Sequence, residues 1–223
     1  MVCELRGLGK STLPDHWQVL PIRAMVKQVK TPVLVTPGRE YPIIGVRWYG
    51  AGAYVKDVVT ETTTEASHLY KLSSGQLVYN RLFAWKGSFA LLGEEHEGAY
   101  ASGEFPTFVA REGFDVRFVY FYLLQEGLWE WIAAESTGAT ANSRNRWQEV
   151  RLRSLVIPSP PHREQQAIAD FLTREVDRIM NQLRLMGAPL TPEEGSLAHA
   201  LLRERYAVVR AAVTGAYPLG DHP

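Results

Sequence analysis

The sequence has no excess charge of either sign, almost no cysteine and no long apolar run. Its 223 residues carry 24 Lys and Arg against 24 Asp and Glu, so net charge gives no general argument for a nucleic-acid partner. The single cysteine, Cys3, excludes an internal disulfide and predicts an incidental thiol. No apolar stretch approaches the roughly 18 residues of a membrane span, and the first residues lack a signal-peptide core. We expect a cytoplasmic protein with no membrane partner.

Motifs of catalysis and of metal binding are also missing. The six histidines include no pair at metal-ligand spacing on a helix, and no CxxC, HExxH, GxSxG or phosphate-binding glycine loop occurs. The acidic stretch from Gly93 to Gly98 surrounds one histidine with three carboxylates, which is more typical of a solvated loop tip than of an acid-base pair. We predict no catalytic residue, no metal ligand and no cofactor. A stand-alone nuclease would need clustered acidic ligands that the sequence does not show.

Residues 14–160 indicate a mixed domain. Short β-branched runs bracketed by proline and glycine predict strands at "TPVLVTPG", "EYPIIGV", "SFALL" and "FPTFVA". A buried helix is predicted from the N-cap Asp115 to the stop signal Gly127, followed by a shorter helix through "LWEWIAAE". We expect an α+β fold with a twisted sheet in residues 1–160 and a helical, coiled-coil-like arm in residues 161–223.

A proline-rich step separates these two parts. Pro158, Pro160 and Pro161 follow an apolar run, and because proline cannot donate to a β ladder, the strand is expected to stop there. Beyond the step, apolar residues at spacings of three and four predict a helix over residues 162–186 that ends at Gly187. A second helix is predicted to restart at the N-cap Thr191 and to end at Thr214 and Gly215.

Both helices are amphipathic and need a partner surface, which could be each other, another copy or a different protein. The residues predicted to form these contacts are Ile168, Leu172, Val176, Ile179, Leu183, Leu201 and Val209.

Two polar segments are candidates for DNA binding. The segments "NRLFAWKG" (80–87) and "ESTGATANSRNRW" (135–147) combine asparagine and arginine, which suit base edges, with short polar side chains that suit phosphates. The first could equally be a strand and turn around a packed tryptophan, and the second a polar connection. Trp48 and Trp85 are expected to be mainly structural, because duplex DNA keeps its bases stacked. The predicted DNA contacts are Asn80, Arg81, Lys86, Ser136, Thr137, Thr140, Asn142, Ser143, Arg144 and Arg146.

Taken in order, these segments resemble the specificity subunit of type I restriction-modification systems. The resemblance rests on "YPIIGVRWYGAGAYVKDVV", "GQLVYNRLFAWKGSFALL", "ASGEFPTFVA", "STGATANSRNRW", "LVIPSPPHREQQAIADFL" and "LLRERYAVVRAAVTG". It implies a non-catalytic protein with a target-recognition domain in residues 1–160 and a helical spacer, dimerisation and docking region in residues 161–223. The implied partners are double-stranded DNA, a DNA methyltransferase subunit and, through the complex, a restriction and translocase subunit.

The chain departs from the usual pattern in carrying one recognition domain and one helical region, where family members usually carry two of each. It is expected to be either a half-length subunit that forms a homodimer on a palindromic, interrupted target, or a fragment. The break "GAPLTPEEG" also interrupts what is commonly one long helix. The alternative function is an assembly or regulatory partner of a DNA methyltransferase that has lost DNA reading.

Overall fold

The short β-branched runs build two main sheets in the computed structural model, which describes residues 2–6, 9–136, 146–187 and 197–214. One sheet is antiparallel throughout, in the order β10 (Phe89–Leu91), β9 (Leu77–Tyr79), β12 (Thr107–Ala110) and β4 (Val26–Val29). The other has five strands, in the order β5 (Pro32–Leu34), β8 (His68–Lys71), β11 (Tyr100–Ala101), β6 (Tyr41–Val46) and β7 (Ala53–Val59). Its pairs are antiparallel except β11 with β6. The predicted strands are therefore confirmed.

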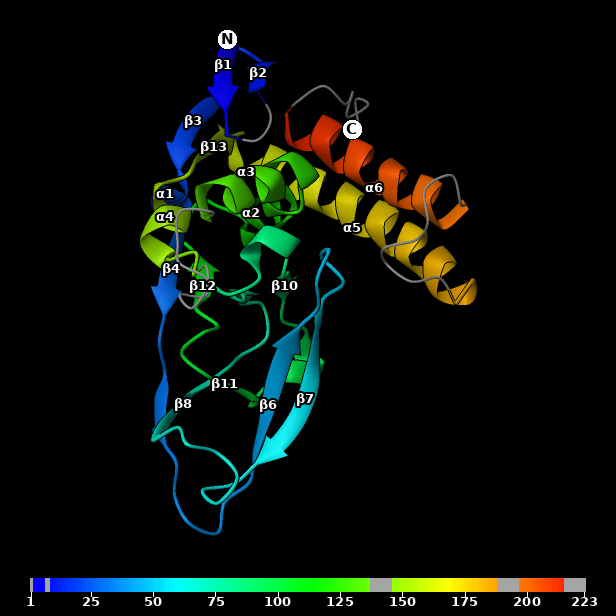
Figure 1. Cartoon of the computed structure of the whole chain (residues 1–223). Helices are drawn as coiled ribbons and strands as arrows, with labels where there is room; N and C mark the ends of the chain where they lie inside the picture. Colours follow the sequence, from blue (N-terminus) through cyan, green and yellow to red (C-terminus); the bar gives the residue numbers. More distant parts are fainter. Residues whose placement is uncertain (1, 7–8, 137–145, 188–196, 215–223) are drawn as a thin grey trace.

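The molecule is elongated, with the helices gathered at one end and the five-stranded sheet at the other (Figure 1). Two short ribbons complete the helical end: β1 (Val2–Leu5) with β2 (Gly9–Thr12), and β3 (Gln18–Pro21) with β13 (Val156–Ser159). The strand stops within the proline step as expected: β13 includes Pro158, opposite Val19, and ends at Ser159, before Pro160. A two-stranded ribbon leaves each strand a free edge, so a proline there breaks no further ladder.

The helices α2 (Val116–Leu123) and α3 (Glu126–Ser136) differ from the prediction in where they divide. Asp115 is the N-cap of α2 as predicted, and its carboxylate accepts from the Arg117 N–H at 2.8 Å. Gly127 does not end this helix. The Gln125 side chain donates to the Tyr122 carbonyl at 3.0 Å and closes α2 early, so Gly127 falls in the first turn of α3. The second helix is consequently the longer of the two.

Four further short helices were not predicted. Two are α-helices, α1 (Ile22–Met25) and α4 (Glu149–Ser154), and two are 3-10 helices, η1 (Ala84–Lys86) and η2 (Glu94–His96). Each has six residues or fewer, too short for a helical apolar stripe to be visible in the sequence.

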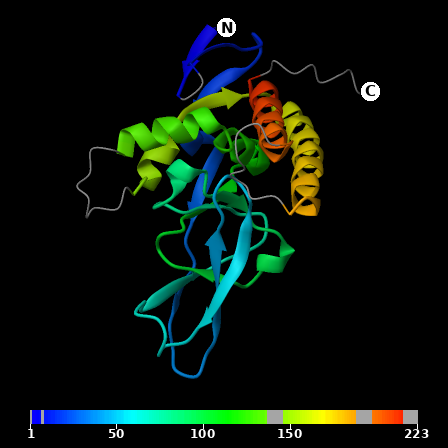
Figure 2. The ribbon, with the colours of Figure 1, turned by 45° about the vertical axis from the view of Figure 1, so that its right-hand side comes forward.

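The helical arm consists of α5 (His162–Leu185) and α6 (Leu197–Val213), which lie side by side and antiparallel (Figures 1 and 2). The prediction for α5 is confirmed to within one residue, and Gly187, at φ +60°, donates its N–H to the Arg184 carbonyl as a C-terminal stop. The predicted N-cap Thr191 and the closing Gly215 lie outside the described residues. Among the described residues, no helix is long and apolar enough to cross a membrane.

One hydrophobic core joins the arm to the rest of the chain. The stripe of α5 is buried against α2 and α6, in the same cluster as the residues between α2 and the four-stranded sheet. The α5 members of this core are Ile168, Ala169, Leu172, Val176, Ile179, Met180 and Leu183. Of the partner surfaces expected for the two amphipathic helices, the structure shows that they pack on each other; they also pack on α2, which was not expected.

Side chains in the first turn of α5 make hydrogen bonds that fix the helix at the proline step. Gln165 is buried, donates to the Pro160 carbonyl at 2.8 Å and accepts from the Asp115 N–H at 3.0 Å. Glu164 accepts from the indole N–H of Trp17 at 2.9 Å and lies 2.9 Å from the His16 ring nitrogen. The Glu164-Gln165 pair, which belongs to one of the segments that carry the resemblance, thus connects α5 to the start of α2 and to the N-terminal segment. The α+β fold with a C-terminal helical arm is confirmed.

Candidate nucleic-acid interface

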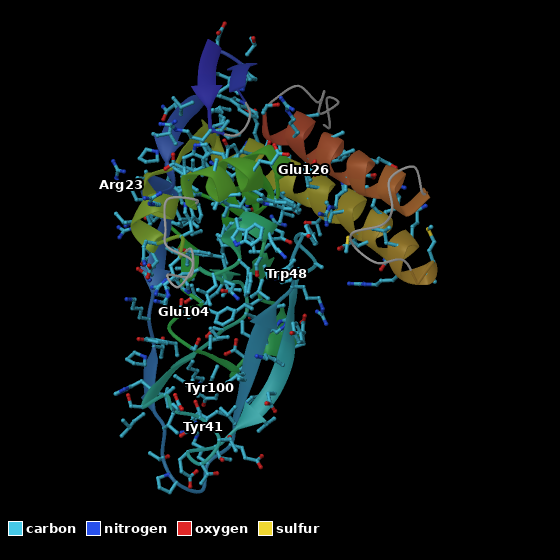
Figure 3. The ribbon with its side chains drawn as sticks, in the orientation of Figure 1. Arg23, Tyr41, Trp48, Tyr100, Glu104 and Glu126 are labelled. Atoms are coloured by element: carbon cyan, nitrogen blue, oxygen red, sulfur yellow. The ribbon has the colours of Figure 1, made fainter. Side chains whose placement is uncertain are left out.

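A groove of about 500 Å³ lies along β6 and β7, on the side of their connecting turn. Its walls combine aromatic rings with two cations and one amide, and no aspartate or glutamate lines it. The lining residues are Gly45, Val46, Arg47, Trp48, Tyr49, Tyr54, Lys56, Asn80, Phe83 and Phe105. Figure 3 shows the labelled Trp48 at the level where the helices meet the five-stranded sheet. The groove is therefore a basic and aromatic surface at the middle of the molecule.

The floor of the groove depends on a glycine, Gly45, which has no side chain. Gly45 in β6 is paired with Tyr54 in β7, and a Cβ at Gly45 would lie 2.7 Å from the tyrosine ring. Only glycine leaves room for the ring to lie across the strand. The Arg47 guanidinium lies over the Tyr54 ring, 4.2 Å from its centroid, and its Nη1 donates to the Ala53 carbonyl.

The turn between β6 and β7 supplies the second wall. Tyr49 adopts a left-handed φ of 59°, and its N–H donates to the Lys86 carbonyl at 2.7 Å. This bond holds the turn against η1 and brings the Lys86 ammonium to 3.6 Å from the Trp48 ring centroid. Trp48 also contacts Phe83, at 5.4 Å between ring centroids, and remains 40% exposed.

Three cations at this surface are available to an anionic ligand. Within the described residues, no carboxylate lies at ion-pair distance from Arg47, Lys56 or Lys86. Aromatic rings hold two of them in place without neutralising their charge. The surface thus concentrates positive charge, although the chain as a whole is neutral.

Two of the predicted DNA contacts are instead held in ion pairs beside the groove. Arg81 pairs with Glu149, which also accepts from the Gln28 amide at 3.2 Å. Arg146 pairs with Glu104 at 2.7 Å. The Arg81–Glu149 pair lines a small adjoining pocket of about 150 Å³. These arginines would have to exchange a carboxylate for a phosphate in order to contact DNA.

The remaining predicted DNA contacts are placed less fully. Asn80 is buried at the edge of the groove, and its side-chain oxygen accepts from the Leu82 N–H at 2.9 Å. Lys86 lies over Trp48, as described above. Ser136 ends α3 but its side chain, like Thr137, Thr140, Asn142, Ser143 and Arg144, lies outside the described residues. The role of the whole set in DNA binding stays a prediction.

The sequence did contain a signal for Arg47, Tyr54 and Lys56, the groove residues that were not among the predicted DNA contacts. The stretch "RWYGAGAYVK" (47–56) places two glycines in a turn between basic and aromatic residues, and Tyr54 and Lys56 share one face of a strand. Trp85 donates its indole N–H to the Leu82 carbonyl at 3.1 Å, an arrangement that fits its expected structural role. Trp48, at the groove, makes no hydrogen bond of this kind among the described contacts.

The residues predicted to contact a partner are mostly in the interior. The five α5 positions and Val209 are buried in the chain's own core, and the side chain of Leu201 lies outside the described residues. Contact of this stripe with a second copy stays a prediction, and it would require the arm to open. Within the described residues, no group of three or more His, Cys, Asp and Glu gathers closely enough to hold a metal ion.

Glu149 predicts a pH dependence. Burial favours its neutral form, but hydrogen bonds from its own N–H and from Arg81 outweigh burial and hold its pKa below the ordinary value. A lowered folded-state pKa adds stability that is present above the unfolded value, about 4.3, and is lost as pH falls through the folded pKa. The melting temperature of Glu149→Gln should therefore fall less than that of wild type as the pH is lowered from about 7 to about 3. Exposed Glu112→Gln is the control, and equal losses in wild type and Glu149→Gln would contradict the prediction.

No family model and no curated protein matches the chain, but solved structures do. The HsdS subunit from Thermoanaerobacter tengcongensis is similar with a TM-score of 0.61 and 15% identity, over 78% of this chain and 45% of that chain. A chain from a structure of complex assembly and conformational transition of the type I R-M system is similar with a TM-score of 0.58 and 15% identity, over 95% and 53%.

This chain thus spans about half the length of the solved chains that it matches. The predicted resemblance is confirmed at the level of the fold: the chain has the fold of HsdS, the specificity subunit of type I restriction-modification systems.

Proposed function

We propose that the chain is a DNA-binding specificity subunit of a type I restriction-modification complex. It would direct methyltransferase and restriction subunits to a bipartite target in the cytoplasm and perform no catalysis itself. The observation that carries the proposal is the groove of β6 and β7. Arg47 and Lys56 line it, Lys86 lies beside it over Trp48, and none of the three has a carboxylate partner among the described residues. The fold shared with HsdS supports the same reading.

The chemistry of the groove suits a DNA backbone with nearby base edges. Arginine and lysine contact phosphates, and each such contact releases counterions. Arg47 is both a phosphate ligand and, by its planar fork, a suitable partner for a guanine edge. The rings of Trp48 and Tyr54 hold the cations in place, so less side-chain freedom is lost when a phosphate binds.

Alanine at both Arg47 and Lys56 should weaken DNA binding and flatten its salt dependence by about one unit of slope per lost phosphate contact. The measurement is the dissociation constant across a salt series, using a motif enriched from random-sequence DNA with the methyltransferase subunit present. Lys71→Ala is the matched control, because Lys71 is exposed on β8 of the same sheet and does not line the groove. Unchanged affinity and slope in the double variant would refute a phosphate role for the groove.

One observation favours the alternative, an assembly or regulatory partner that does not read DNA. Arg81 and Arg146, two of the predicted DNA contacts, are already neutralised by Glu149 and Glu104. Enrichment of no motif from random-sequence DNA, together with formation of a stable methyltransferase complex, would decide for the alternative.

We also propose that two copies assemble, each reading one half of an interrupted target. One recognition domain reads one half-site, and a two-fold axis would supply the second. Because the α5 stripe is buried within the chain, the dimer would use other surfaces or an opened arm. Light scattering of the chain alone and with the methyltransferase subunit and DNA tests this, and a monomer under all conditions would contradict it.

A further inference from the structure

Arg205 is a buried cation that connects the helical arm to the groove. It lies in α6 and is 1% exposed. Its Nη2 donates to the Tyr49 carbonyl at 2.6 Å, across 156 positions of sequence, and its Nη1 lies 3.4 Å from the Met180 sulfur in α5. Burial of a guanidinium is costly unless hydrogen bonds replace its water. The arginine is therefore suited to fixing the position of one backbone oxygen.

The oxygen that it holds belongs to the strained turn of the groove. Tyr49 is the one non-glycine residue with a positive φ in the part of the chain that the structure describes. A left-handed conformation is unfavourable for such a residue and persists only where surrounding contacts enforce it. Two contacts do so: the Tyr49 N–H donates to Lys86, and its carbonyl accepts from Arg205. The next residue, Gly50, donates to the Gly87 carbonyl at 2.9 Å.

The hydrogen bond from Arg205 to Tyr49 also affects the position of Trp48 in the groove. Trp48 directly precedes Tyr49, and the Lys86 that binds the Tyr49 N–H also places its ammonium over the Trp48 ring. Without Arg205, the Tyr49 carbonyl would lose its partner in a part-buried site, and the turn would be free to relax toward a common φ. Trp48 and Lys86 would then move with it.

We propose that Arg205 is a positioning residue for the DNA interface: docking of α6 sets the arrangement of Trp48 and Lys86. This inference rests on the proposed function of the groove. It adds that the arm takes part in the interface without touching the ligand, so a protein that displaces α6 would lower DNA affinity. Coupling of this kind is reciprocal, so DNA in the groove would also strengthen docking of α6.

The test uses the full chain labelled with 5-fluorotryptophan. The resonance of Trp48 is assigned with Trp48→Phe, and Trp17, which is bonded to Glu164 away from the groove, serves as the internal reference. Arg205→Met removes the donor while keeping an unbranched side chain, and Arg205→Lys restores the charge with a single ammonium. Arg174→Met is the matched control, since Arg174 is exposed on α5 of the same arm.

We expect Arg205→Met to shift or broaden the Trp48 resonance in free protein, to leave Trp17 unchanged, and to weaken DNA binding roughly tenfold or more. Arg205→Lys should restore part of both signals, whereas Arg174→Met should change neither. If Arg205→Met does not fold, the comparison of Arg205→Lys with wild type decides, with an intermediate shift expected.

The outcomes separate the two proposals. If the wild-type chain binds DNA, and folded Arg205→Met shows an unchanged Trp48 resonance and unchanged affinity, the positioning role alone is overturned. A loss of affinity without any change at Trp48 would also overturn it, because the effect would then bypass the turn. A wild-type chain that binds no DNA, with or without the methyltransferase subunit, would overturn the function of the groove and with it this inference.

Discussion

Aspartate at both Leu172 and Ile179 is expected to leave the chain unfolded at room temperature. Both side chains are 0% exposed and lie in the core shared by α2, α5 and α6. Truncation of one such residue to alanine costs about 2–5 kcal/mol, and burial of an unpaired carboxylate costs more. Since a domain is stable by about 5–15 kcal/mol, two such changes exceed the reserve. Far-ultraviolet circular dichroism with urea titration measures the result.

Leu185→Asp is the matched control. Leu185 is the last residue of the same helix but is 89% exposed, so its replacement should change stability by no more than about 0.5 kcal/mol. The double variant also tests the predicted division at residue 160. If the helical and the strand signals of the double variant are lost together, the arm and the recognition part fold as one unit. If the sheets stay folded while only the helical signal disappears, the arm is a separate domain.

Much of the arm could be predicted because its signal is local. The stripe of α5 repeats at helical spacing, and Gly187 marks the end of the helix, so both bounds follow from neighbouring residues. The same holds for the N-cap Asp115. Gly127 misled because a stronger local cap, the Gln125 side chain on the Tyr122 carbonyl, ends α2 first. A glycine is a permissive stop signal and not an obligatory one.

The complete groove could not be predicted, although the stretch 47–56 carried a signal for part of it, because Asn80, Phe83 and Phe105 join the hairpin of β6 and β7 only in the folded chain. Tyr54 lies over Gly45 because of the register of β6 with β7, which includes a bulge that the residues do not announce. Arg205 reads as a polar position of an amphipathic helix, yet it is buried and bonded to Tyr49. In the same way, Arg81 and Arg146 look like free DNA contacts until their carboxylate partners are brought beside them.

Gly87→Ala should be among the most damaging changes of a single methyl group in this chain. Gly87 has a φ of +66°, and an added Cβ would lie 2.4 Å from the Trp129 ring. The left-handed conformation alone costs about 1–2 kcal/mol with a side chain. Overpacking against a buried ring adds about 1–3 kcal/mol. We expect a total loss of about 2–5 kcal/mol, measured as the shift of the urea midpoint at constant slope.

Gly113→Ala isolates the contribution of the backbone. Gly113 has a φ of +80°, but nothing lies within 4 Å of the position of its Cβ, so only the conformational cost applies. The difference between the two variants therefore measures the clash with Trp129. Because Gly87 also accepts from Gly50 in the turn of the groove, a shifted Trp129 would displace the turn that carries Trp48. Equal losses in the two variants would show that Trp129 moves aside freely, and the close fit of α3 against η1 would then not be what holds the groove in shape.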